Sequence, residues 1–329
     1  MKPRVLSGLR PTGNVHLGHL AGALSNWATL QDRYDCFYFV ADWHALTSDY
    51  ADTSGVVESA FDNVADWMAA GLDPERSTIF VQSMVPEHAE LYLLLSMIIP
   101  IPWLERVPTY KEQIDQLKDK DLSTIGFLGY PLLQTADIII YNAHYVPVGE
   151  DQVPHLELSR EVVRRFHNFY GEVFVEPQPL LTRFPRLPGL DTRKMSKSYG
   201  NAIDLADDAE TVRKKVMQMY TDPKRVRADI PGTVEGNPVF LYHDAFNPNT
   251  AEVDDLKDRY RAGKVGDVEV KQKLARALNA LLEPIRERRA AIDARPGYVR
   301  EVMEQGSKKA REVAGETMDR VRAAVRLKY

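Results

Sequence analysis

The sequence has a single cysteine among its 329 residues, Cys36, which lies in the apolar run Cys36–Val40. One cysteine excludes an internal disulfide, so we predict a reducing, cytoplasmic setting in which Cys36 is a small core residue. No segment approaches the roughly 20 apolar residues of a membrane-spanning helix. The N-terminus also lacks the pattern of a signal peptide. These absences predict a cytoplasmic protein with no membrane partner.

Positive charge is in the minority, with 42 Lys and Arg against 47 Asp and Glu and a net charge of −5. This balance argues against non-specific binding of nucleic acid, so a nucleic-acid partner has to use local basic patches. Each basic cluster could equally be a solvated helix face. The candidate clusters, all after residue 200, are 213–215, 224–227, 286–289 and 308–311.

Short apolar segments alternate with segments of helical periodicity over the first 81 residues. Strands are expected at 5–8, 37–41 and 78–81, and helices at 17–31 and 56–70. Strands that alternate with helices predict an α/β fold with a Rossmann-like, doubly wound parallel sheet.

The pattern changes further along the chain. The middle third predicts helices at 89–99, 110–120, 130–141 and 153–166 and one more strand at 145–149. After Gly200 only helices are expected, at 208–219, 253–260, 268–292 and 298–327, with Pro284 kinking or breaking the third. We therefore predict a Rossmann-like domain of residues 1–198 and an all-helical domain of residues 199–329, whose last helix could pack back on the first domain.

The first chemical constellation spans residues 11–19, between the first strand and the first helix. A glycine-containing loop at a helix N-terminus presents unpaired backbone N–H groups, which suit phosphates. Gly18 would let a ligand approach the backbone closely. His16 and His19 share one helical face, but no cysteine or third histidine lies nearby, so no protein-held metal is predicted. Taken alone, the segment could equally be an ordinary strand–helix turn.

The second constellation spans residues 194–198. Two lysines with hydroxyls between them form a compact clamp for polyphosphate, and Gly189 and Gly200 on either side could allow the loop to close. A short run of lysine and serine alone is more often a solvated loop.

The third constellation places Tyr130, Gln134 and Asp137 on one face of one helix. Asp137 precedes three isoleucines, and a carboxylate in such surroundings needs a partner. An indole N–H is a donor only and a carboxylate an acceptor only, so this pair would select an indole. The alternative is that Asp137 pairs with a donor of the protein itself.

Together these segments resemble a known family. The run 16–19 resembles the HIGH signature of class I aminoacyl-tRNA synthetases, and 194–198 matches their KMSKS signature. Segments 42–47, 130–138 and 146–152 are similar to the compact bacterial tryptophan form, and the resemblance covers essentially the whole chain. Two departures stand out: Gln134 occupies a position where many members have Met, and the stretch 186–193 is shorter than the common version.

The resemblance implies ATP-dependent activation of L-tryptophan to tryptophanyl-adenylate, followed by transfer to tRNA(Trp), with Mg²⁺ as a cofactor. It implies a homodimer with an interface over about 103–137, and an anticodon-reading role for the helical domain. The catalytic residues would be His16, His19, Lys194 and Lys197. The ATP-binding residues would be Arg10, Pro11, Thr12, Gly18, His19, Gly149, Glu150, Asp151, Leu187, Lys194, Met195, Ser196, Lys197 and Ser198. The tryptophan pocket would comprise Asp137, Tyr130, Gln134, His44, Gln152, Val146 and Val148.

Three alternatives share parts of this pattern. A tyrosyl-tRNA synthetase has the same fold and both signatures, although 149–152 and 134–137 look more like the tryptophan form. A small-molecule nucleotidyltransferase also uses an HxGH loop, but such chains are usually shorter and lack the helical half. A catalytically silent RNA-binding paralogue is disfavoured by the intact His16, His19, Lys194 and Lys197.

Overall fold

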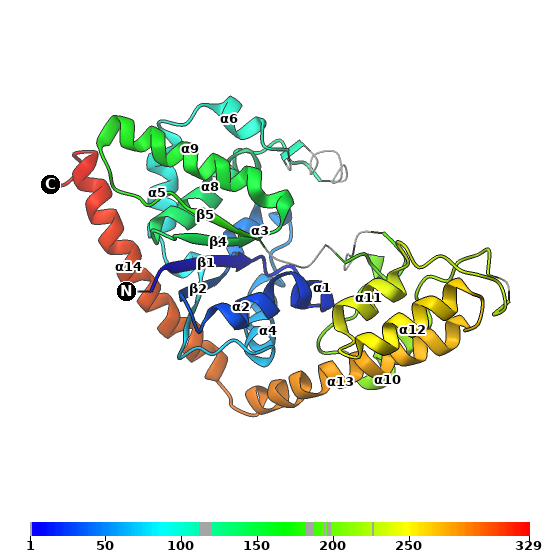
Figure 1. Cartoon of the computed structure of the whole chain (residues 1–329). Helices are drawn as coiled ribbons and strands as arrows, with labels where there is room; N and C mark the ends of the chain where they lie inside the picture. The colour runs from blue at the N-terminus through cyan, green and yellow to red at the C-terminus, as the bar shows by residue number, and fades with distance from the viewer. Residues whose placement is uncertain are drawn as a thin grey trace.

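Five parallel strands form one sheet at the centre of the N-terminal half (Figure 1). The computed structural model describes residues 2–108, 110–111, 120–181, 187–193, 195, 199–225 and 227–329, and of residue 151 the backbone alone. The strands are β1 (Arg4–Leu9), β2 (Asp35–Val40), β3 (Ser77–Val81), β4 (Tyr145–Val148) and β5 (Gln178–Leu181). Their spatial order is β3-β2-β1-β4-β5, and every neighbouring pair is parallel. The predicted α/β fold class is confirmed.

Side chains of successive strand residues enter two separate cores, one on each face of the sheet. Val5 and Cys36 point into the first core, whereas their neighbours Leu6 and Phe37 point into the second. Cys36 is free and fully buried, as expected of a core residue. The first core is covered by α1 (Leu17–His19), the π-turn η1 (Leu20–Leu24), α2 (Ser25–Leu30) and α4 (Val56–Ala69). The second is covered by α5 (Glu87–Ser96), α6 (Ile101–Glu105), α8 (Ile125–Ile140) and α9 (Val153–Tyr170).

Most predicted elements of this half are present, with differences at their ends. The helix expected at 17–31 contains a π-helical segment at Leu20–Leu24, which the sequence periodicity did not predict. Helix α8 begins five residues earlier than expected, because the Thr124 hydroxyl caps it by accepting the Phe127 N–H at 3.1 Å. Helix α3 (Asp42–Asp49), helix α6 and strand β5 were not predicted. The helix expected at 110–120 lies mostly outside the described residues.

The C-terminal half is helical, as expected. Its helices are α10 (Ala209–Met217), the unpredicted α11 (Pro238–Phe246), α12 (Thr250–Arg261) and α13 (Asp267–Asp293). Helix α13 packs against α10 and α11 and also against α4 of the sheet half. The division of the chain at residues 198 and 199 stays a prediction.

Pro284 was expected to kink or break its helix, and of these two outcomes the break does not occur. Helix α13 continues through Pro284 from Asp267 to Asp293. Leu282 and Ile285 on either side are buried. Their tertiary packing compensates for the backbone hydrogen bond to the Ala280 carbonyl that proline removes.

The last helix, α14 (Tyr298–Ala324), leaves the helical half and runs along β3, the edge strand of the sheet (Figure 1). The Ser307 hydroxyl accepts the Val81 N–H at 3.1 Å. A Cβ at Gly306 would lie 1.8 Å from the Ile79 carbonyl oxygen, so only glycine allows this contact. No helix in the described part of the chain is long and apolar enough to cross a membrane.

The close approach of α14 to β3 yields a prediction. Gly306→Ala should lower the free energy of unfolding by about 1–3 kcal/mol, because the added methyl forces the helix away from the strand. Gly315→Ala in the same helix is the matched control, since nothing lies within 4 Å of its Cβ position; it should be neutral or stabilising by up to about 1 kcal/mol. Urea unfolding measures both, and equal effects would show that the α14–β3 contact does not constrain position 306.

Candidate active site

A cavity of about 400 Å³ lies at the carboxyl ends of β1 and β4. The chain fills the sheet outward from β1 through β2 to β3 and then returns to place β4 on the other side of β1. Ligands of open α/β sheets bind at such a reversal of strand order. Gly8 at the end of β1 keeps the floor open, since a Cβ there would lie 2.6 Å from the Phe39 ring.

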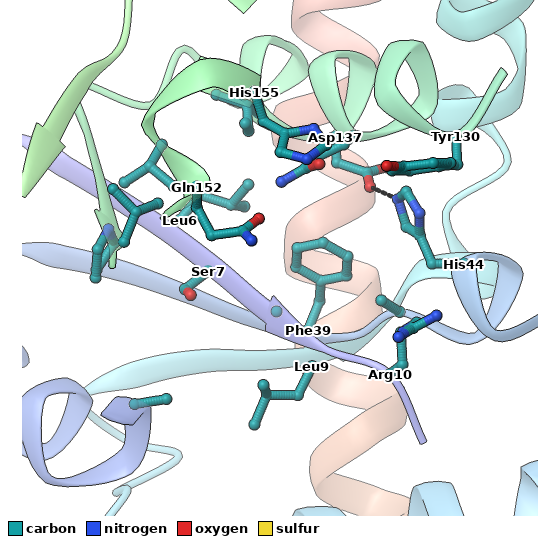
Figure 2. A pocket seen from close by; sticks show the side chains of 18 of the residues that line it. Leu6, Ser7, Leu9, Arg10, Phe39, His44, Tyr130, Asp137, Gln152 and His155 are labelled. Carbon is teal, nitrogen blue, oxygen red and sulfur yellow. Dashed lines mark hydrogen bonds and ion pairs between the residues drawn. The ribbon is translucent and has the colours of Figure 1, made fainter. Parts of the chain in front are cut away.

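The cavity brings together residues from five separate segments of the chain (Figure 2). Every residue predicted for the tryptophan pocket lines it, and so do two of those predicted for ATP. The nine are Arg10, His44, Tyr130, Gln134, Asp137, Val146, Val148, Gly149 and Gln152.

Asp137 is the most enclosed charged group of the cavity, with a residue exposure of 1 %. Its Oδ1 accepts hydrogen bonds from His88 Nδ1 at 2.6 Å and Gln82 Nε2 at 2.8 Å. Its Oδ2 lies 2.8 Å from His44 Nε2, the contact drawn in Figure 2, and 3.0 Å from Gln82 Nε2. The sequence analysis considered the alternative that Asp137 pairs with donors of the protein itself, and the structure contains such donors.

These donors determine the charge of Asp137. Burial raises the pKa of its carboxyl, but hydrogen bonds and charge interactions with His44 and His88 outweigh burial and hold the pKa below its ordinary value. A carboxylate has about four accepting positions. Oδ1 accepts from His88 and Gln82, and Oδ2 accepts from His44 and the same Gln82 amide. His44 lines the cavity and His88 does not, so Oδ2 is the oxygen on the cavity side.

The histidine motif forms a second locus at the start of α1. His16 caps the helix, its Nδ1 accepting the Gly18 N–H at 3.2 Å, while His19 Nδ1 accepts the His16 N–H at 3.3 Å. The two rings stack with centroids 3.7 Å apart. Because both Nδ1 atoms accept, both rings carry their hydrogen on Nε2, where each can donate to a ligand.

One contact joins the two sequence motifs. A Cβ at Gly18 would lie 2.9 Å from the Met195 sulfur, so Met195 packs against the glycine of the first motif. The other predicted residues of the second motif, Lys194, Ser196, Lys197 and Ser198, lie outside the described residues, as does the side chain of Asp151. Among the remaining ATP candidates, Thr12 and Glu150 are exposed, whereas Pro11 and Leu187 are buried; none of these four lines the cavity.

Comparison with known proteins decides the family. Residues 1–283 match the class I tRNA synthetases for tryptophan and tyrosine. The chain is 53 % identical over 327 residues to the tryptophan–tRNA ligase of Thermotoga maritima, covering 99 % of this chain and 100 % of that protein. The chain belongs to the class I tRNA synthetases.

Solved structures agree with this assignment. The tryptophanyl-tRNA synthetase of Campylobacter jejuni, complexed with ADP and tryptophan, matches this synthetase with a TM-score of 0.84 and 31 % identity, over 98 % of this chain and 99 % of that one. A tyrosyl-tRNA synthetase from Archaeoglobus fulgidus, complexed with L-tyrosine, matches with a TM-score of 0.69 and 26 % identity, over 88 % and 90 %.

The synthetase site also contains residues that sequence reasoning missed. Gln82 follows β3 in the 3-10 turn η2 (Gln82–Met84), His88 is in the first turn of α5, and Tyr141 follows α8. All three are fully buried and belong to the Asp137 network. A lone histidine or glutamine within an apolar stretch is a weak signal, because only the fold brings segments 50 residues apart together.

Both motif histidines of the synthetase are neutral at physiological pH. Burial, together with the smaller effect of the adjacent His16, lowers the pKa of His19 to about 3. Burial also lowers the pKa of His16, although Asp204 opposes the shift. These rings therefore serve a ligand as N–H donors and not as cations.

The neutral His19 predicts how stability depends on pH. In the unfolded chain this ring binds a proton near pH 6.5, but in the fold only near pH 3. The contribution of neutral His19 to the free energy of unfolding is therefore complete above pH 6.5. It is lost as the pH falls, by at most about 1.4 kcal/mol per pH unit. His19→Asn should flatten the fall in the unfolding free energy between pH 7 and pH 4. An unchanged slope in denaturant titrations would mean that His19 is protonated in the folded protein.

Proposed function

We propose that this synthetase activates L-tryptophan with ATP to tryptophanyl-adenylate and transfers the tryptophanyl group to tRNA(Trp). The observation that carries the proposal is the buried, ionised Asp137, whose Oδ2 is on the side of His44 in a cavity at the reversal of strand order. Identity with a curated tryptophan–tRNA ligase over essentially the whole chain supports it.

The amino-acid site is the described cavity. Oδ2 of Asp137 would accept the indole N–H in place of its contact with His44, while Val146 and Val148 provide apolar walls and Tyr130 and Gln152 provide polar groups. Phenylalanine has no ring donor, so it would gain no hydrogen bond to this carboxylate. Sites built to bind a polar group reject an analogue that lacks it by roughly 10⁴ or more.

ATP would extend from this cavity toward the motif histidines. Arg10 and Gly149 line the cavity and would face the nucleotide. His16 and His19 would donate from Nε2 to phosphate oxygens. Lys194 and Lys197 are proposed to neutralise the departing pyrophosphate, and the packing of Met195 on Gly18 supports a position for their loop beside the histidines. The protein then acts by positioning and by stabilising charge.

Mg²⁺ is proposed to bind ATP phosphates and not a protein cluster. Within the described ranges, no group of three or more His, Cys, Asp and Glu residues could hold a metal ion. The divalent ion would supply positive charge beside the phosphates.

The anticodon of tRNA(Trp) is proposed to contact the helical half. Several cations of the basic clusters serve the fold instead: Arg225 is buried and donates to three carbonyl oxygens, Arg289 pairs with three aspartates, and Arg311 pairs with Glu87. Exposed lysines such as Lys214 and Lys224 are therefore better candidates for phosphate contacts.

We also propose a homodimer in the cytoplasm. Apolar side chains are exposed on three helices that pack together, α5, α6 and α8. They are Leu93, Met97, Ile101 and Ile125, exposed by 53 %, 70 %, 57 % and 83 %. Exposed apolar side chains on or beside neighbouring helices support an interface in this region. The buried, free Cys36 supports a reducing compartment.

The proposed interface predicts an effect on assembly. Met97→Glu together with Ile125→Glu should shift sedimentation from dimer to monomer, because two charges would be buried without partners. Val57→Glu is the matched control, as Val57 is 66 % exposed on α4, on the other face of the sheet. A double variant that sediments as the wild type does would place the dimer interface elsewhere.

The function itself is tested by amino-acid-dependent pyrophosphate exchange over the twenty amino acids. Tryptophan should be activated preferentially; a preference for tyrosine would replace this proposal with the tyrosyl activity. Asp137→Asn should retain part of the exchange, because its amide oxygen still accepts, whereas Asp137→Ala should lose about 1.5–3 kcal/mol of selectivity. The measure is kcat/KM for tryptophan relative to its benzothiophene analogue, which lacks the N–H. An alanine variant with the wild-type ratio would exclude Asp137 as the acceptor.

A further inference from the structure

His88 contacts Asp137 Oδ1, whereas His44 contacts Oδ2, and His88 does not line the cavity. We propose that His88 is a positioning residue for amino-acid selection: it fixes Oδ1 of Asp137, so that Oδ2 is held toward the cavity for the indole N–H. The inference rests on the proposed function and adds a residue that does not itself touch tryptophan.

The hydrogen bonds around His88 define its state. Its Nδ1 is 2.6 Å from Asp137 Oδ1, and an ionised carboxylate only accepts, so Nδ1 carries a hydrogen. Its Nε2 is 2.7 Å from the Tyr141 hydroxyl, so these two atoms share a hydrogen bond. A chain of hydrogen bonds thus runs from Tyr141 through His88 to Asp137. Each of the three residues is exposed by 1 % or less.

The network is anchored on rigid elements. His88 is in the first turn of α5 and Asp137 is on α8, two helices that pack against each other. Gln82 completes the support, because its Nε2 donates to both carboxylate oxygens while its Oε1 accepts the Trp43 N–H at 3.1 Å. Two donors therefore fill Oδ1 from the protein side, and rotation of the carboxylate would break both bonds.

A second consequence concerns charge. The titratable groups in contact with Asp137 are His44 from α3 and His88 from α5, while Tyr141 faces it through His88, and Glu87 and Arg4 act on Tyr141. Burial raises the pKa of Asp137, and the two histidines reverse that shift. Without the His88 donor, burial is less opposed, and the pKa of Asp137 rises. Tryptophan activation then falls at low pH, because protonation removes the charged acceptor.

The experiment compares wild type with three variants by pyrophosphate exchange. His88→Leu removes both hydrogen bonds; its ratio of kcat/KM for tryptophan over the benzothiophene analogue should drop about tenfold or more. As the pH is lowered, the kcat/KM of this variant for tryptophan should begin to fall at a higher pH than in wild type. His88→Asn places an amide N–H near the position of Nδ1 and should recover most of the ratio. Tyr141→Phe removes only the hydroxyl and should lower the ratio severalfold.

His243→Leu separates positioning from general stability. His243 is also fully buried, but it lies in α11 and its Nε2 is 3.0 Å from the Val270 carbonyl oxygen. It should lower the melting temperature and leave the ratio unchanged. A folded His88→Leu variant with the wild-type ratio and pH profile overturns the proposal. If that variant does not fold, Tyr141→Phe decides, and an unchanged ratio and pH profile there overturn it. Wild type that fails to discriminate the two substrates would instead contradict the proposed role of Asp137.

Discussion

The amino-acid site depends on one constraint: a carboxylate can stay charged inside a protein only if donors surround it. Asp137 meets this constraint through His44, Gln82 and His88, which come from three different segments of the chain. Each donor depends on the sheet, because β2 leads into α3, β3 leads into η2, and α5 follows directly. Burial and selectivity are thus linked. The enclosure that raises the free energy of the charge also raises the free energy of binding a substrate that lacks a hydrogen-bond donor for it.

The two motif histidines and Asp137 represent different uses of burial. Burial removes charge from His16 and His19, so these rings offer N–H groups to anions. Asp137 keeps its charge because its partners outweigh burial. The site therefore contains neutral donors in one place and a charged acceptor in another. The neighbours of each side chain, and not its residue type alone, determine its charge.

Local patterns predicted much of this molecule. Alternating strands and helices gave the parallel sheet, and the spacing of Tyr130, Gln134 and Asp137 placed all three on one cavity wall. The π-turn at Leu20–Leu24 and the continuity of α13 through Pro284 were not predictable, because tertiary packing overrides local preference there. His88 and Gln82 were missed for a related reason: a buried polar residue reveals its role only when the fold supplies its partner. The parts of the site that lie within residues 194–198 rest on sequence alone, apart from Met195.

Helix α14 has a consequence for the order of events during synthesis. Strand β3 is an edge strand, and edge strands offer unpaired backbone groups to other chains. Its cover, including the Ser307 hydroxyl that accepts the Val81 N–H, lies near the end of the sequence. At the usual pace of translation, on the order of ten seconds or more separate the appearance of the strand from that of its helix. During that interval the nascent sheet is open at one side, and the period of greatest risk of misassociation ends when the last helix docks.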